Sequence, residues 1–353
     1  MSMTSEAKGY PMKCLPGYVN ARPGIQIGTA LAPTASDEEI QFAKQVGADW
    51  VIVGDPGEHT VAKYREIKRR FEAHGLQVYT IRHSTIGENM EEITLNLPGR
   101  DEKLQAYLNY LRALGGADIR YARYAHMGNG IWSTEREPIR GGAMSRAFRL
   151  PKAREGRWFN KTWQAPLTHG RVYSEQEIWD NYAYFIERVV PVAEEVNVYV
   201  GIHPDDPPVP VLGGVPRPIF SSFEGYRKAL EIANSAHVGV SLCLGCWLEG
   251  GASMGKDVIE TIRYFGKQHR IYIVDFRNVS APIEDGGFVE TFMDEGYMDM
   301  SQVMRALREV EYDGVVWSDH LPQMVGGRYA AEAFSIGYLR ALVQAVNSEA
   351  KGR

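Results

Sequence analysis

The fold is decided by a unit that recurs along the chain, and its clearest copy is residues 50–81, WVIVGDPGEHTVAKYREIKRRFEAHGLQVYTI. A short apolar run at 50–54 is followed by helical spacing at 61–74 and by a second apolar run at 77–81. Short β-branched runs predict strands, and apolar residues repeating every three or four positions predict a helix. The unit is therefore typical of a parallel β/α fold.

The same alternation continues almost to the C-terminus, and it predicts eight strands and eight helices. The predicted strands are residues 25–31, 50–54, 77–81, 118–122, 197–202, 238–242, 271–276 and 314–318. The predicted helices are residues 37–46, 61–74, 101–114, 175–195, 223–234, 256–268, 301–309 and about 331–346. Ser36 and Glu39 form a capping-box signature before the first helix. Eight such units in one chain predict a single (β/α)₈ TIM barrel.

A doubly wound sheet is the alternative architecture. It would be favoured by a glycine fingerprint after the first strand, but residues 28–33, GTALAP, contain none. We predict an N-terminal extension at 1–24, a barrel at 25–347 and a C-terminal tail at 348–353. The barrel is expected to carry a long loop insertion at about 123–174, over its C-terminal mouth, as a lid or an oligomer contact.

Composition narrows the functional classes. The 353 residues include 39 Lys and Arg against 44 Asp and Glu, which gives a formal charge of −5 and argues against a nucleic-acid partner. The apolar runs are far shorter than the roughly 20 residues of a membrane-spanning helix, so no membrane partner is expected. Three cysteines and no signal-peptide pattern predict a cytoplasmic protein. We also expect a homo-oligomer.

Polar side chains stand where seven of the predicted strands end, which is where TIM barrels carry their catalytic residues. In chain order they are Asp55, His83, Tyr124 with His126, His203, Cys243, Asp275 with Arg277, and Asp319 with His320. Four consecutive strands end at His203, Cys243, Asp275 and Asp319. These nitrogen, sulfur and oxygen donors suit a divalent transition metal.

The neighbours of these donors have alternative interpretations. Cys243 and Cys246 form a C-x-x-C, but a structural zinc site would need a second pair, so Cys246 is expected to be a small buried residue behind the barrel. Arg277 is either an anion clamp beside the metal or a partner in a salt bridge. His320 is either functional at the barrel mouth or a surface histidine.

Four stretches resemble the mannonate dehydratases, metal-dependent lyases of hexuronate breakdown with a xylose-isomerase-like barrel. These stretches are HPDDPP at 203–208 with LGGVPR at 212–217, SLCLG at 241–245, VDFRNV at 274–279 and SDHLPQM at 318–324. The likeness also includes GADWV at 47–51 and spans most of the barrel.

The resemblance implies a manganese-type ion held by His203, Cys243, residue 275 and Asp319, with Mg²⁺, Fe²⁺, Co²⁺ or Zn²⁺ as other candidates. It implies His320 as a catalytic residue and Arg277 as a substrate contact. Tyr329 is the match for a further catalytic tyrosine, although residues 325–333 depart from the family pattern. In the implied reaction a base, His320 or Tyr329, removes the proton next to the substrate carboxylate, and an acid from the same pair protonates the leaving hydroxyl.

Residue 275 is Asp here, whereas the family has His. One thiolate and two carboxylates around a divalent ion leave one negative charge, while the family's set is neutral. A more anionic centre binds an acidic substrate less readily, so Asp275 points to a changed substrate such as a neutral sugar, a different metal or a weakened metal site.

These features predict a metal-dependent sugar-acid dehydratase that converts D-mannonate to 2-keto-3-deoxy-D-gluconate and water. The expected partner is a small sugar acid or sugar. One alternative is an isomerase or epimerase of the same barrel class, acting on a neutral sugar. The other is a catalytically silent sugar-binding or scaffold subunit.

Overall fold

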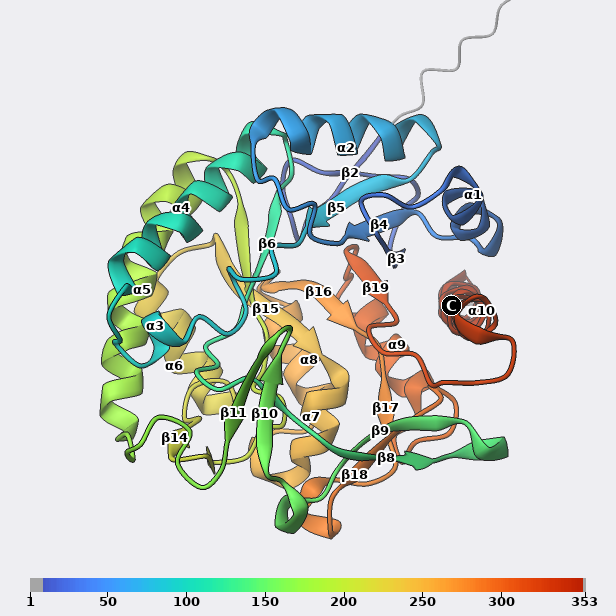
Figure 1. Ribbon diagram of the computed structural model, residues 1–353. Coiled ribbons are helices and arrows are strands. Elements are labelled where there is room, and N and C mark those ends of the chain that lie inside the picture. Colours follow the sequence, from blue (N-terminus) through green and yellow to red (C-terminus); the bar gives the residue numbers. More distant parts are fainter. Residues whose placement is uncertain (1–8, 352–353) are drawn as a thin grey trace, which may run out of the picture.

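The computed structural model describes residues 9–351, which form an eight-stranded parallel sheet surrounded by helices (Figure 1). The strand order in the sheet is β5-β4-β3-β19-β16-β15-β12-β6, and every pairing is parallel. Counted by their place in the chain, these strands run 3-2-1-8-7-6-5-4, which is the cyclic order of a TIM barrel. The predicted (β/α)₈ barrel is confirmed.

All sixteen predicted elements overlap observed ones. The barrel strands are β3 (Gln26–Leu31), β4 (Trp50–Val53), β5 (Gln77–Ile81), β6 (Tyr121–Tyr124), β12 (Tyr199–Ile202), β15 (Val238–Cys243), β16 (Ile271–Asp275) and β19 (Val315–Trp317). The helices are α1 (Asp37–Val46), α2 (Val61–Ala73), α3 (Glu91–Thr94), α4 (Arg100–Gly116), α5 (Glu175–Glu195), α6 (Phe223–Ala233), α7 (Leu244–Gly250), α8 (Val258–Gly266), α9 (Met300–Glu309) and α10 (Gly327–Lys351). The Ser36 capping box is present at α1.

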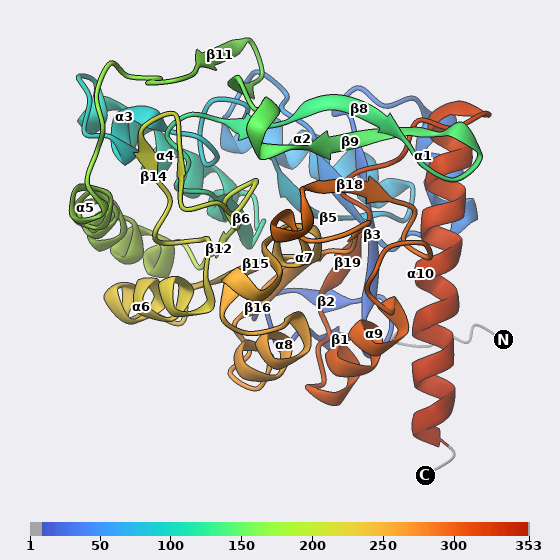
Figure 2. The ribbon, with the colours of Figure 1, turned by 90° about the horizontal axis from the view of Figure 1, so that it is seen from below.

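Shorter strands lie outside the barrel. They are β1 (Tyr10–Pro11), β2 (Val19–Asn20), β7 (Ile131–Trp132), β8 (Thr134–Pro138), β9 (Met144–Phe148), β10 (Glu155–Trp158), β11 (Lys161–Gln164), β13 (Val211–Leu212), β14 (Val215–Pro216), β17 (Asn278–Val279) and β18 (Phe288–Thr291). Figure 2 shows β8, β9 and β18 across one end of the barrel, with β1 and β2 toward the other.

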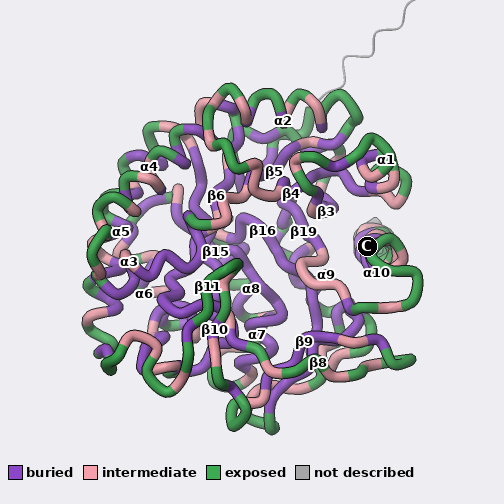
Figure 3. The backbone as a smooth tube through the Cα atoms, viewed as in Figure 1, coloured by how far each residue is buried: buried purple, intermediate pink, exposed green. Residues whose placement is uncertain are grey.

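The barrel strands are buried on both faces, as Figure 3 shows for the centre of the molecule. Every residue of β12, β15, β16 and β19 is buried. Residues 9–24 cover the end of the barrel opposite the mouth, where the Tyr18 ring packs 5.0 Å from that of Trp50 and 5.5 Å from that of Tyr79. The described part of the predicted N-terminal extension thus belongs to the barrel core, while residues 1–8 lie outside the described residues.

The segment expected to be a long loop is built differently. Residues 123–174 contain β7 to β11, and β9 pairs with β18, which follows β16 in the chain. β8 and β9 join β17 and β18 in a four-stranded antiparallel sheet, β17-β18-β9-β8, over the mouth, whereas β7, β10 and β11 form a separate three-stranded sheet. A pairing between strands about 140 residues apart leaves no local sequence pattern, so the joining of β9 to β18 was not predicted.

Two boundaries also differ from the prediction. The fourth strand begins at Tyr121 and not at Asp118, because Asp118 takes a left-handed conformation with φ of 56° that a strand cannot contain. At the other end, α10 continues to Lys351, so most of the predicted tail at 348–353 is helical and residues 352–353 lie outside the described residues. Within residues 9–351, no helix has the length and apolar character to cross a membrane.

The barrel has one seam, between β5 and β6, where the hydroxyl of Thr80 donates a hydrogen bond of 2.8 Å to the carbonyl of Tyr121. We expect Thr80→Val, which keeps the side-chain shape, to lower the free energy of unfolding by about 1 kcal/mol because a buried carbonyl loses its donor. Urea-induced unfolding measures this change. The matched control is Thr162→Val on the exposed strand β11, which should leave stability unchanged; equal effects of the two substitutions would contradict a role for Thr80 at the seam.

Candidate metal centre

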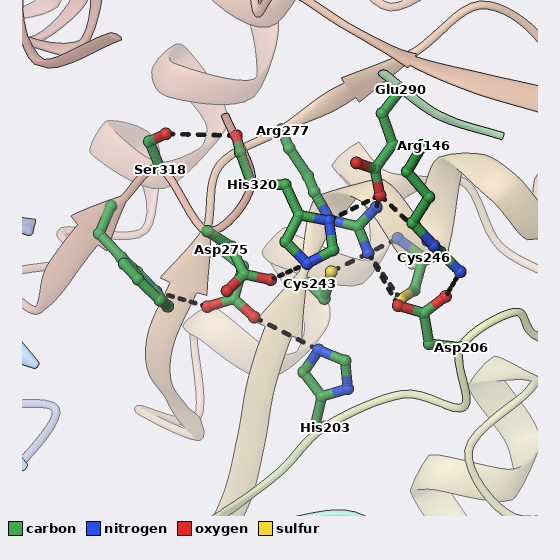
Figure 4. Close-up of polar contacts among 12 residues, drawn as sticks. Arg146, His203, Asp206, Cys243, Cys246, Asp275, Arg277, Glu290, Ser318 and His320 are labelled. Atoms are coloured by element: carbon green, nitrogen blue, oxygen red, sulfur yellow. Dashed lines mark hydrogen bonds and ion pairs between the residues drawn. The ribbon is translucent and has the colours of Figure 1, made fainter. Parts of the chain in front are cut away.

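Four side chains meet at the mouth of the barrel. His203 follows β12, Cys243 ends β15, Asp275 ends β16 and Asp319 follows β19. Their potential ligand atoms all lie within 4.8 Å of one another. Figure 4 shows His203 and Cys243 reaching toward Asp275 from different elements. The structure thus brings together the four residues that the sequence places at consecutive strand ends.

The donor atoms fit a cation. The Nδ1 of His203 lies 2.7 Å from the carbonyl of Pro204, so an Nδ1–H donates there and Nε2 is the nitrogen that faces Asp275 Oδ2, 3.4 Å away. That Oδ2 is buried and has no hydrogen-bond partner among the described residues. A buried carboxylate oxygen without a partner is costly unless a positive charge lies beside it. Imidazole, thiolate and two carboxylates are a suitable set for a divalent ion.

Cys243 has the environment of a thiolate. Burial alone would raise the pKa of its thiol, but the hydrogen bond with Cys246 and the charge of Arg277 outweigh burial and lower the pKa well below the ordinary value. The backbone N–H of Cys246 also points to the Cys243 sulfur, at 3.5 Å. Cys246 is buried as predicted, but it lies beside the metal centre, with its sulfur 3.2 Å from Arg277 Nη2, and not behind the barrel. The thiolate is the form of cysteine that binds metals.

Arg123 is a charged residue of this centre that the sequence analysis missed. It lies on β6, on the same face as Tyr121, and its Nη2 is 2.5 Å from Asp275 Oδ1. Burial would raise the pKa of Asp275, but Arg123, together with His203 and Trp317, outweighs burial and lowers it, so this carboxylate is ionised. The charge count from the sequence left the metal centre with one negative charge because of Asp275. That count therefore omitted the positive charge of Arg123. The run YARY at 121–124 signals an inward arginine, but the strand had been placed three residues too early.

Arg277 occupies a buried network beside the metal centre. Its Nη1 lies 2.7 Å from both Glu249 and Glu290, and its Nη2 lies 3.4 Å from Asp206. Arg146, from β9, contacts the same three carboxylates. Of the two interpretations open from the sequence, the structure favours the salt bridge: the guanidinium is only 3% exposed and its terminal nitrogens have partners. Substrate contact by Arg277 stays a prediction.

The network needs a glycine at position 245. A Cβ built there would lie 2.4 Å from Arg277 Cζ, so a larger residue would displace the guanidinium. This explains the glycine in the SLCLG stretch in physical terms, because only glycine lets the arginine pass so close to the start of α7.

His320 stands at the edge of the metal centre. Its Nδ1 is 2.7 Å from Glu290 Oε1, and its Nε2 is 3.4 Å from Asp319 Oδ2. Burial would lower its pKa, but the charges of Glu290 and Asp319 outweigh burial and raise the pKa to about 9. With a side chain that is 34% exposed, His320 is the most accessible member of the group. It is thus a protonated, solvent-reachable imidazole beside a metal-ligand candidate.

Tyr329 is not brought to this group. It lies near the start of α10, 47% exposed, with its ring 4.6 Å from that of Phe42 on α1. The departure of residues 325–333 from the family pattern coincides with this placement. Asp55 and His83, the polar residues after β4 and β5, gather with His59 in a separate cluster.

An eight-stranded barrel with these donors at its strand ends belongs to the xylose-isomerase-like class of TIM barrels. A xylose isomerase domain protein from Planctomyces limnophilus superposes with a TM-score of 0.61 at 11% identity, covering 93% of this chain and 99% of the other. A mannonate dehydratase from Streptococcus suis serotype 2 superposes with a TM-score of 0.79 at 24% identity, covering 92% of this chain and 96% of the other.

Sequence comparison narrows the class to a family. The model of the D-mannonate dehydratase (UxuA) family matches residues 146–353, more than half of the chain. Mannonate dehydratase from Thermotoga neapolitana is 29% identical over 304 residues, covering 78% of this chain and 81% of the relative. That from Streptococcus pneumoniae is 28% identical over 296 residues, covering 78% of each. The chain belongs to the D-mannonate dehydratase family, and the resemblance predicted from the sequence is confirmed.

Glu249 and Glu290 contact the same two arginines but differ in charge. Burial and Asp206 raise the pKa of Glu249 to about 8, whereas His320 and Arg277 outweigh burial and lower the pKa of Glu290. At pH 7 Glu249 therefore carries a proton and resembles glutamine. At pH 7 we expect Glu249→Gln to keep or raise the free energy of unfolding, because glutamine stays neutral without taking up a proton, and Glu290→Gln to lower it by about 3 kcal/mol.

The pH dependence of the free energy of unfolding tests whether Glu249 carries a proton. Because the folded-state pKa of Glu249 exceeds its ordinary value of 4.5, the stability it adds is lost as the pH rises toward 8. As the pH rises from about 4.5 to 8, the free energy of unfolding of Glu249→Gln should therefore rise relative to that of the wild type. Urea-induced unfolding at several pH values measures this, and a large loss at pH 7 would show that Glu249 is ionised.

Proposed function

We propose that this protein is a divalent-metal-dependent hydro-lyase that converts D-mannonate to 2-keto-3-deoxy-D-gluconate and water. Family membership supports the reaction and the substrate. The observation that carries the metal dependence is the convergence of four donors, from four consecutive strand ends, beside the protonated His320. The acidic substrate is consistent with Arg123, which balances the extra charge of Asp275.

The residues that would hold the ion are His203, Cys243, Asp275 and Asp319. When bound, the ion supplies a Lewis acid that polarises substrate oxygen atoms. Two carboxylates suit Mn²⁺, which we propose as the resident metal, although thiolate and imidazole also accept Fe²⁺, Co²⁺ or Zn²⁺. Burial would lower the pKa of His203, but Asp275 and Cys243 outweigh burial and raise it to about 10. Metal binding requires the neutral imidazole and should therefore release a proton.

In the reaction, the C–H bond next to the carboxylate and the C–OH bond of the following carbon both break. The proton from this C–H bond and the hydroxyl together leave as one water, and the enol that forms moves its O–H proton to carbon to give the keto acid. His320 is the group placed to protonate this hydroxyl, because its pKa of about 9 keeps it protonated at neutral pH. Glu290 accepts its Nδ1–H and directs Nε2 toward Asp319, the metal-ligand candidate. Tyr329 is assigned no proton transfer here, since it lies against Phe42.

We expect His320→Asn to lower turnover of D-mannonate by about 10² to 10⁴, the usual cost of removing a general acid, while fold and metal content are kept. His74→Asn, a partly exposed histidine at the end of α2, is the control and should leave turnover unchanged. Tyr329→Phe should also keep near wild-type turnover. Steady-state kinetics measure the turnover of each variant, and elemental analysis checks its metal content. A His320→Asn variant with full turnover would remove this residue from the mechanism.

Metal dependence is tested by elemental analysis of protein purified without chelator, followed by removal of the ion. We expect about one divalent ion per chain, loss of turnover and a lower melting temperature after chelation, and recovery of both with Mn²⁺. The product separates the alternatives: a dehydratase product has lost one water, whereas an isomerase or epimerase product keeps the mass of its substrate. Full turnover by metal-free protein would contradict the proposal, and so would the lack of any dehydrated product.

A further inference from the structure

The metal centre contains more negative charge than a divalent ion neutralises. Cys243, Asp275 and Asp319 supply three negative charges when ionised, so the filled centre would keep one of them. Two cations contact this set: His320, which is also paired with Glu290 at 2.7 Å, and Arg123, which lies 2.5 Å from Asp275 Oδ1. The Arg123 side chain is 10% exposed, so water screens its charge only weakly.

The pairing of Arg123 is specific. Glu88 is the other carboxylate within reach, 3.9 Å from Arg123 Nε. Arg82 already binds Glu88, at 3.0 Å, from the more exposed side. Two arginines therefore face two carboxylates, and the shorter contact of Arg123 is to Asp275. The charge of Arg123 is thus available to the metal centre.

We propose that Arg123 is a specificity-determining residue, which balances the charge of Asp275 so that the filled metal centre is neutral and admits an anionic carboxylate substrate. The inference rests on the proposed function, because it assumes the bound ion. In this proposal Arg123 favours binding of the substrate and not binding of the metal. The positive charge of Arg123 repels a bound metal ion. Its favourable effect must therefore be on the binding of a negatively charged substrate.

The effect of the charge of Arg123 can be separated from its effect on the position of Asp275. Asp275 Oδ1 also accepts a hydrogen bond of 2.5 Å from Trp317 Nε1, so the carboxylate keeps one of its anchors when Arg123 is replaced. Asp275 Oδ2, the oxygen that faces His203, contacts neither anchor. Replacing Arg123 by an uncharged residue therefore changes mainly the charge of the centre.

The test uses Mn²⁺-loaded protein and two probes of similar size, anionic D-mannonate and neutral D-mannitol. In Arg123→Gln we expect the Kd for D-mannonate, or its KM, to rise about tenfold, the scale of one weakly screened charge several ångströms away. The affinity for D-mannitol should change less than twofold, and the affinity for Mn²⁺ should not fall. Isothermal titration calorimetry measures all three.

Three variants complete the design. Arg123→Lys restores the charge and should return the D-mannonate affinity to within about threefold of wild type. Arg171→Gln, the control, removes an exposed arginine that pairs with Glu177, and should have no effect. Should Arg123→Gln fail to fold, Arg123→Met, an uncharged side chain of similar length, takes its place with the same expected loss for D-mannonate.

The outcomes are distinguishable. Wild-type protein that binds no divalent ion, or does not dehydrate D-mannonate, overturns the proposed function. Wild-type protein that does both, with an Arg123→Gln variant that binds D-mannonate as tightly, overturns the role of Arg123 alone. Equal losses for D-mannonate and D-mannitol would make Arg123 a structural residue and also overturn the proposal.

Discussion

Charge buried away from water must be balanced at short range, and this constraint organises the whole mouth of the barrel. Burial makes an unpaired ion costly, so each buried charge needs a partner in contact. Asp275 has Arg123, Glu290 has Arg277 and His320, and Asp206 has Arg146. These contacts hold the side chains around the four donors, so the metal centre is shaped before any ion arrives. The barrel supplies the positions, and the ion pairs set the orientations.

The sequence predicted the barrel well because its signals are local. Each strand is a short apolar run, each helix has its own spacing, and the order of eight units specifies the topology without knowledge of contacts. The four donors were predicted for the same reason: in a parallel barrel the strand ends meet at one mouth, so His203, Cys243, Asp275 and Asp319 had to lie close together. Their positions follow from chain order alone.

What the sequence could not predict depends on contacts between distant segments. Glu290 reaches His320 because β18 pairs with β9, and no local pattern announces that pairing. Arg123 was missed through a three-residue error in the start of β6, caused by the left-handed conformation of Asp118. The charge of Asp275 was interpreted without its partner, and the conclusion that the centre is anionic followed from that omission. Tyr329 was matched by its place in the chain, but α10 directs it to Phe42.

The sheet over the mouth is therefore part of the site and not a cover added to a finished barrel. Arg146 of β9 and Glu290 of β18 are both buried in contact with each other, at 3.0 Å, and each also contacts a residue carried by a barrel strand end. Removing the sheet would leave Arg277 with fewer anionic partners and His320 without the carboxylate that raises its pKa. A barrel alone can collect the four donors, but the proton-transfer group requires the two insertions to pair. The position of the four donors and the position of His320 thus depend on different parts of the chain.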